Sequence, residues 1–348
     1  MIAGFRQWAG LSDRPAGPSA RPFGVRDDGV NVMTIADTDI ERTAPAAGPP
    51  RRPKSHGLGK RLIPFWFLLP TAIILGGLIL YPVAYAFWLS FHDYQWNMPR
   101  FGRPFVGLDN YVALPEDEDL IAAVWWTILF AFGSVPIGFL MGLGMALLLN
   151  STVLGRFRGL LRGIFLVPMM LAGVVAGFMW RTLFDTEYGP INHLLGFVGI
   201  EPISWFTSEL AARSAVIITE VWLTTPFVLL VLLAGLQGIP DELHEAARID
   251  GASAIRQFVD ITLPLLRSAI AIVLIIRTMD ALRAFDQIYV LTGGGPGTDT
   301  TTVMYYAYLY GFRYYQFGRA SAISFAILVA IALITAVYLA VLRRAERD

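Results

Sequence analysis

The chain has 348 residues, of which 55% are apolar and only 16% are charged. Soluble domains carry about 25% charged residues, so this composition, with a mean hydropathy of +0.56, indicates a polytopic membrane protein. The chain has 27 basic residues (lysine and arginine) and 27 acidic residues (aspartate and glutamate). It therefore lacks the net positive charge that would indicate nucleic-acid binding. Cysteine is absent and the 4 histidines are scattered, which argues against a disulfide framework and against a thiolate or zinc site.

Residues 1–60 differ from the remainder of the chain. They are rich in proline, glycine, alanine and arginine and contain no sustained apolar period. Such a segment buries too little apolar surface to offset the entropy of ordering it, so we expect a disordered cytoplasmic arm. No apolar run of signal-peptide length follows its first charges. A start at Met33 instead of Met1 would leave everything downstream unchanged.

Six stretches are apolar and long enough to cross a membrane, since a spanning helix needs about 20 mostly apolar residues. They are residues 62–91, 121–149, 163–180, 214–236, 263–285 and 320–342. They lack the alternation of barrel strands. The sequence therefore predicts an all-α polytopic membrane protein with six transmembrane helices, comprising a transmembrane domain over 61–343 and a cytoplasmic tail over 344–348.

Lysine and arginine are distributed unevenly between the two sides of these helices. With the N-terminus inside, most of those that flank a predicted span lie on the inner side, namely Arg51, Arg52, Lys54, Lys60, Arg61, Arg156, Arg158, Arg162, Arg248, Arg256, Arg343, Arg344 and Arg347. Positive charge near the spans favours the cytoplasmic side. We therefore expect both termini to be cytoplasmic.

The inner loop over residues 238–264, between the fourth and fifth predicted spans, has a helical pattern of its own. Pro240 and Asp241 suit a helix start, and Gly251 suits its end. One nearly flat face of this helix carries Leu243, Ala246, Ala247 and Asp250. Periodicity leaves two interpretations open: another protein approaches this face closely, or the helix lies at the lipid headgroups.

The same loop resembles the EAA signature of bacterial ABC-importer permeases. The matching segments are Glu245-Ala246-Ala247, Asp250-Gly251-Ala252 and Ile261-Thr262-Leu263-Pro264. In that family the short helix docks into a cleft of the ATP-binding subunit and couples its closure to the membrane domain. The resemblance thus implies coupling roles for Glu245, Ala246, Ala247, Asp250 and Gly251.

Three other segments resemble carbohydrate-uptake permeases of the maltose-F type, in the binding-protein-dependent ABC importers. They are FVGLDNY at 105–111, WLTTPF at 222–227 followed by LAGLQGIP at 233–240, and FDQIYVLTGGGPG at 285–297. The resemblance covers about residues 62–343. It implies the type I importer membrane domain, with no enzymatic site of its own and no cofactor bound by this chain, because ATP and Mg are used by the partner ATPase.

The resemblance also implies a set of partners and a location. A permease subunit of this kind pairs with a homologous second permease, two ATP-binding subunits and an extracytoplasmic sugar-binding protein, and carries a carbohydrate, such as an oligo- or disaccharide, across the bilayer. Its location is the bacterial inner (cytoplasmic) membrane. ATP hydrolysis then resides in a separate subunit, and the chain itself is not an enzyme.

Ionisable residues inside a membrane span are costly and are therefore candidates for function. The fourth predicted span places on one face Glu220, Thr224 and Phe227, and the fifth places on one face Arg277, Asp280, Ala281 and Ala284. A sugar path needs polar groups, an aromatic ring and small residues that leave room. We expect the two faces to meet around a polar cavity; the alternative is an ion network that only holds the helices together.

The resemblance to maltose-type permeases implies sugar-lining positions on the same two helices. Counted without gaps from the EAA signature, they are Glu220, Leu223, Thr224, Phe227, Val228, Arg277, Ala281, Ala284 and Asp286. The family pattern uses neutral amides and a hydroxyl where this chain has Arg277, Ala281 and Ala284. This departure argues against maltose itself as the substrate.

One other function competes with an importer permease. A secondary transporter or channel would use Glu220, Arg277 and Asp280 as an ion relay, but the EAA loop has no role there.

The glycines at 293–297 lack the lysine of a P-loop, so they favour a tight outer turn. The tyrosines between 305 and 315 suit an interfacial aromatic belt or the docking of a solute-binding protein.

Overall fold

The computed structural model describes residues 58–98 and 102–345. The chain divides into two units, Met1–Arg61 and Leu62–Asp348. Most of the predicted arm, residues 1–57, lies outside the described residues, as does the end of the predicted tail, residues 346–348. Within the described ranges the chain is helical, and backbone pairing of the β type is limited to two isolated bridges, His92 with Phe105 and Gln95 with Gln316.

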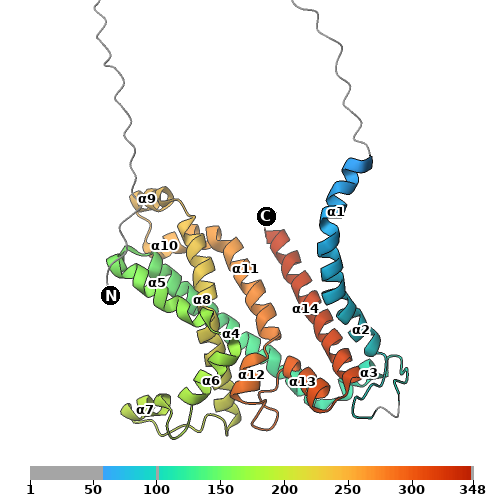
Figure 1. Cartoon of the computed structure of the whole chain (residues 1–348). Helices are drawn as coiled ribbons and strands as arrows, with labels where there is room; N and C mark the ends of the chain where they lie inside the picture. Colours follow the sequence, from blue (N-terminus) through green and yellow to red (C-terminus); the bar gives the residue numbers. More distant parts are fainter. Residues whose placement is uncertain (1–57, 99–101, 346–348) are drawn as a thin grey trace, which may run out of the picture. The chain divides into compact units, whose positions relative to one another are not determined.

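The described helices are joined by connections of very different lengths (Figure 1). They are α1 Leu58–Leu75, α2 Tyr81–Leu89, α3 Asp109–Val112, α4 Glu118–Asn150, α5 Arg158–Leu166, α6 Gly173–Leu183, α7 Pro190–Phe197, α8 Glu209–Gln237, α9 Asp241–Ile249, α10 Ala254–Gln257, α11 Leu263–Leu282, α12 Asp286–Leu291, α13 Val303–Tyr308 and α14 Phe317–Ala345. Single π-helical turns at Gly76–Leu80 and Phe258–Thr262 join α1 to α2 and α10 to α11, and another at Leu309–Arg313 follows α13.

Five described helices are long and apolar enough to cross a membrane. They are Phe67–Leu89, Glu118–Asn150, Glu209–Gln237, Ala254–Leu282 and Phe317–Tyr338. They confirm the first, second, fourth, fifth and sixth predicted spans. The all-α membrane architecture predicted from the sequence is therefore confirmed, with five spans or six if the bent third segment is counted as one.

The third predicted span is not a straight helix. Its two parts, Leu154–Met170 and Gly173–Leu183, meet at 102°. Pro168 has no N–H to donate, a 3₁₀ turn covers Val167–Met170, and the backbone at Leu171 is extended. These features end α5 and restart the helix as α6, which hydropathy alone does not reveal.

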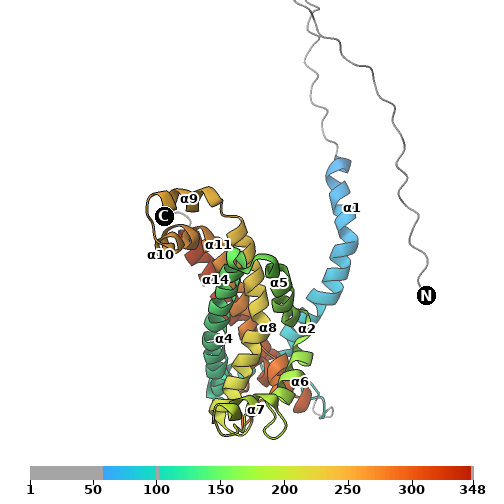
Figure 2. The same cartoon turned by 90° about the vertical axis from the view of Figure 1, so that its left-hand side faces the viewer.

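The centre of the helical unit is the pair α4 and α8, which pack side by side along much of their length (Figure 2). Glycines on α4 allow this close approach. A Cβ at Gly142 would lie only 2.6 Å from the Val228 side chain, and one at Gly133 would lie 3.0 Å from the Ile217 side chain. Helix α11 packs against both helices, so the second, fourth and fifth spans form the core.

Two short helices, α6 and α12, also pack against each other. A Cβ at Gly177 would lie 3.0 Å from that of Val290, and Arg181 Nη1 donates a hydrogen bond to the Val290 carbonyl at 2.8 Å. Helix α12 restarts the chain after the break that follows α11. Helix α6, which follows the bend of the third span, is therefore in packed contact with α12, which follows the break after the fifth span.

Candidate functional site

Helix α9 is the predicted EAA helix, and its bounds confirm the expected start and end. It begins at Asp241 after an extended Pro240, and it ends at Ile249. Gly251 follows with φ +77°, a left-handed conformation that glycine adopts readily and other residues rarely do. The Ala252 N–H donates to the Ala247 carbonyl at 2.9 Å and completes the turn.

Helix α9 contains no buried residue and lies at one end of the helical unit, beyond α8 (Figure 1). Leu243 is 43% exposed and Ile249 is 86% exposed. Of the predicted coupling residues, Ala247 is half-buried, and the exposed ones are Glu245, Ala246, Asp250 and Gly251. This is the arrangement that docking to another protein requires, and the coupling role itself stays a prediction.

The predicted intramembrane charges form one connected network. The Glu220 carboxylate on α8 accepts hydrogen bonds from Arg277 on α11 and from the Gln287 amide on α12. Arg277 Nη1 also donates to Asp280 Oδ2 at 3.0 Å, and Arg283 Nη2 donates to Asp280 Oδ1 at 3.0 Å. Two acids and two bases therefore neutralise one another, and three helices are tied together.

Burial distinguishes the two ends of this network. Glu220 is 3% exposed and Arg277 is 7% exposed, whereas the side chains of Asp280 and Arg283 are 41% and 49% exposed. An unpaired charge in a span is strongly unfavourable, so the pairing of Glu220 with Arg277 meets that requirement. Gln287 was not among the predicted site residues, because it is uncharged and lies on α12, beyond the two span faces that carry most of the predicted ones.

The other predicted pathway residues do not share one environment. Leu223, Thr224 and Phe227 are half-buried, and Asp286 is exposed. Buried among packed side chains are Val228 at 1%, Ala281 at 0% and Ala284 at 6% exposure. Val228 packs on α4 and Ala281 belongs to a hydrophobic core. Val228 and the two alanines are thus covered by packed side chains in two separate clusters, and their role in a sugar path stays a prediction.

A second polar cluster joins the start of α4 to α13 and α14. Asp117 accepts hydrogen bonds from Arg319 at 2.5 Å, from the Tyr306 hydroxyl at 2.7 Å and from the Leu120 N–H at 3.1 Å. Burial acts to raise the pKa of the Asp117 carboxyl, but these hydrogen bonds and the Arg319 charge outweigh it and lower the pKa. Tyr306 is buried, so it belongs to this cluster and not to an exposed aromatic belt.

The glycine-rich segment after α12 is a tightly bonded turn. Gly293, Gly294 and Gly297 have positive φ values, and the Thr300 hydroxyl donates to the Gly295 carbonyl at 2.7 Å. The Thr302 hydroxyl donates to the Ala284 carbonyl at 2.7 Å. The turn predicted at 293–297 is confirmed.

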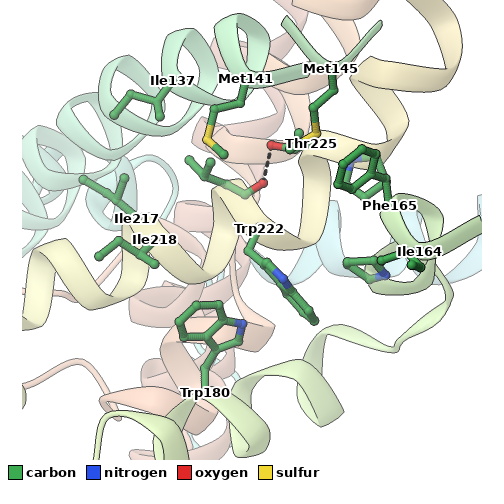
Figure 3. A pocket seen from close by; sticks show the side chains of 13 residues that line it. Ile137, Met141, Met145, Ile164, Phe165, Trp180, Ile217, Ile218, Trp222 and Thr225 are labelled. Atoms are coloured by element: carbon green, nitrogen blue, oxygen red, sulfur yellow. Dashed lines mark hydrogen bonds between the residues drawn. The ribbon is translucent and has the colours of Figure 1, made fainter. Parts of the chain in front are cut away.

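A cavity of about 480 Å³ lies between α4, α8 and the two parts of the bent third segment (Figure 3). Its lining is almost entirely apolar, and it includes the Trp180 and Trp222 rings, whose centroids lie 5.6 Å apart. No cluster of three or more metal-ligating side chains occurs in the part of the chain that the structure describes.

Comparison with known proteins identifies relatives of this chain. Trehalose/maltose transport system permease protein MalF of Thermococcus litoralis is 41% identical over 287 residues, which cover 82% of this chain and 94% of that protein. Sulfoquinovosyl glycerol transport system permease protein SmoG of Agrobacterium fabrum is 40% identical over 296 residues, 84% of this chain and 94% of that protein. Trehalose transport system permease protein SugA of Mycobacterium tuberculosis is 36% identical and covers 81% of this chain and 89% of that protein.

A solved structure shares the fold. The chain is similar to one in a bacterial ABC transporter involved in the import of the acidic polysaccharide alginate, with a TM-score of 0.72 and 25% identity over 82% of this chain and 96% of that one. Residues 117–348 match the family described as binding-protein-dependent transport system inner membrane component. The chain belongs to this family and is a multi-pass transport permease subunit.

Proposed function

We propose that this chain is a permease subunit of an ATP-driven importer of carbohydrates. The observation that carries the proposal is helix α9, an exposed EAA helix that ends in a left-handed glycine between two membrane spans. The named relatives support the substrate class, since they transport trehalose, maltose and sulfoquinovosyl glycerol. The substrate of this chain is accordingly a sugar or a sugar derivative.

The proposed complex contains a homologous second permease, two ATP-binding subunits that bind and hydrolyse ATP with Mg, and an extracytoplasmic sugar-binding protein. The family description, which names dependence on a binding protein, supports the last of these. In this arrangement α9 and both termini lie on the cytoplasmic side of a bacterial inner membrane. This chain itself binds no cofactor.

The chain connectivity suggests how closure of the ATPases reaches the membrane. Only residues 238–240 separate α8 from α9, and α10 with one π turn leads on to α11. A displacement of α9 therefore acts on the fourth and fifth spans together, which are the spans that Glu220 and Arg277 connect. Differential binding of α9 in two ATPase states shifts the population between inward-open and outward-open arrangements.

The substrate path is proposed to run along α8 and α11, beside the Glu220 network. The half-buried side chains of Leu223, Thr224 and Phe227 and the exposed Asp286 are the residues that a second permease would enclose with this chain. The Thr224 hydroxyl already donates to the Glu220 carbonyl at 2.7 Å, so its oxygen remains available as an acceptor for a sugar hydroxyl.

Uptake of labelled trehalose by cells that carry or lack this chain tests the proposal. We expect uptake to need the chain, to stop when cellular ATP is depleted, and to continue when a protonophore removes the proton gradient while ATP is maintained. Uptake that stops with the protonophore alone would support the secondary transporter instead. A parallel series with labelled histidine controls for general loss of membrane transport.

A further inference from the structure

The apolar cavity described above lies on the side of α8 that faces away from the charge network. Ile218 and Trp222 line it and lie two residues before and after Glu220, which places them about 200° around the helix. Figure 3 shows Trp222 between the α4 methionines and Trp180. The one hydroxyl in the lining, that of Thr225, donates to the Val221 carbonyl at 2.6 Å. The cavity therefore offers little to a sugar and suits a hydrocarbon.

The length of the cavity limits what can occupy it. Along α8 its lining runs from Ile217 to Pro226, and along α4 from Ile137 to Met145. At 1.5 Å per residue these distances are about 13 Å and about 12 Å. The hydrocarbon core of a bilayer is about 30 Å thick, so the cavity has the depth of a single leaflet. A spanning helix of another subunit would need a groove about twice as long.

Positive charge lies next to one end of this cavity. Arg162 precedes Phe165, a lining residue, by three positions on α5, so it is on the same helix face and about 4.5 Å further along the axis. Arg158 lies one turn beyond; its Nη2 donates to the Ser151 carbonyl at 2.5 Å, and its Nε is buried without a partner. No carboxylate of the described residues forms an ion pair with either arginine.

We propose that this cavity and these two arginines form a binding site for an anionic phospholipid. One acyl chain occupies the cavity between α4, α5 and α8, and the phosphate group accepts hydrogen bonds from Arg162 and Arg158. An apolar groove one leaflet deep with cationic side chains at one end is complementary to an amphipathic anion of this kind. The lipid would brace α5 at the bend of the third segment, where continuous helix packing is interrupted.

Native mass spectrometry of the chain, purified with the subunits that accompany it, tests this proposal. The probes are phosphatidylglycerol and phosphatidylcholine added in equal amounts. Ile218→Trp places a large ring in the cavity, and we expect it to remove one retained phospholipid per copy of the chain. The matched control is Leu210→Trp on the same helix, since Leu210 is 78% exposed and lies outside the cavity.

The charge of the site is tested separately. Arg162→Gln should lower the preference for phosphatidylglycerol over phosphatidylcholine about fivefold, which corresponds to about 1 kcal/mol for one arginine at a lipid surface. Arg256→Gln, also on a predicted cytoplasmic segment, should leave the preference unchanged. Equal lipid retention by Ile218→Trp and Leu210→Trp would overturn the proposal. Loss of another protein subunit on Ile218→Trp, without loss of lipid, would also overturn it and identify the groove as a protein interface.

Discussion

Substituting Glu220 or Arg277 tests whether their buried ion pair stabilises the helical core. Both side chains are almost completely buried, and removing one partner of a buried pair typically costs about 3–5 kcal/mol. Arg277→Gln leaves Glu220 with Gln287 as its remaining side-chain partner, so we expect a loss near the upper end, about 5 kcal/mol. Glu220→Gln leaves Arg277 paired with Asp280 at 3.0 Å, so we expect a loss near the lower end, about 3 kcal/mol.

The double variant distinguishes this interaction from the general effect of two substitutions. Glu220→Gln and Arg277→Gln together leave no unpaired charge at the buried site. The double variant should therefore lose at least about 2 kcal/mol less free energy of unfolding than the sum of the two single losses. The measurement is the free energy of unfolding of the purified chain in denaturant. A matched cycle on the exposed pair Arg256 and Asp260, 3.6 Å apart, should give at most about 1 kcal/mol.

A coupling energy below about 1 kcal/mol for the buried pair would refute this reasoning, because it would mean that water or substrate already solvates both charges. Uptake per assembled complex adds a second readout. A structural role lowers the amount of complex and leaves uptake per complex unchanged, whereas a role in the sugar path alters uptake per complex. Ala281→Trp does not serve this purpose, since Ala281 is fully buried in the core and a larger side chain would displace its neighbours.

Three further predictions concern other parts of the chain. Gly251→Asp should keep normal membrane levels and abolish uptake, whereas Gly199→Asp, at a glycine between α7 and α8 with the same left-handed φ and equally open space, should keep uptake; failure of both would indicate a folding defect. Deletion of residues 1 to about 55 should preserve uptake, because such a segment contributes no core, and loss of uptake at normal membrane levels would contradict this. Asp117→Asn should lower the free energy of unfolding by about 1–3 kcal/mol at neutral pH, and by less in acid. Since the pKa of Asp117 is lowered, its contribution is complete above the unfolded value of 3.8 and is lost as the pH falls through the folded value, so a constant difference between pH values would contradict the assignment.

Local signals in the sequence predicted the EAA helix accurately. Its start at Asp241 and its left-handed Gly251 follow from a proline, two acidic residues and a glycine within one short segment. The spans with uninterrupted apolar runs were also predictable, since length and hydropathy decide them. The bend at Pro168 was not, because proline occurs within continuous helices too: Pro136 and Pro226 lie inside α4 and α8.

Features that depend on tertiary contacts were outside the reach of the sequence. Val228 lies among the predicted pathway residues of α8, and the structure buries it against α4, where Gly142 allows close approach; its role in a path stays a prediction. The periodicity of one helix cannot show which face another helix covers. Gln287 likewise completes the Glu220 site from a helix 67 positions later in the chain, and an uncharged amide gives no signal in a search for costly charges.

The packed contact between α6 and α12 has a mechanical consequence. Gly177 and Val290 leave no space for sliding, and Arg181 holds the Val290 carbonyl, so α6 cannot rotate at the bend of its span without carrying α12. Because Gln287 on α12 also holds Glu220, such a rotation pulls directly on α8. The bend before α6 and the chain break before α12 are therefore mechanically linked. A movement of α6 or α12 is transmitted to α8, the fourth span.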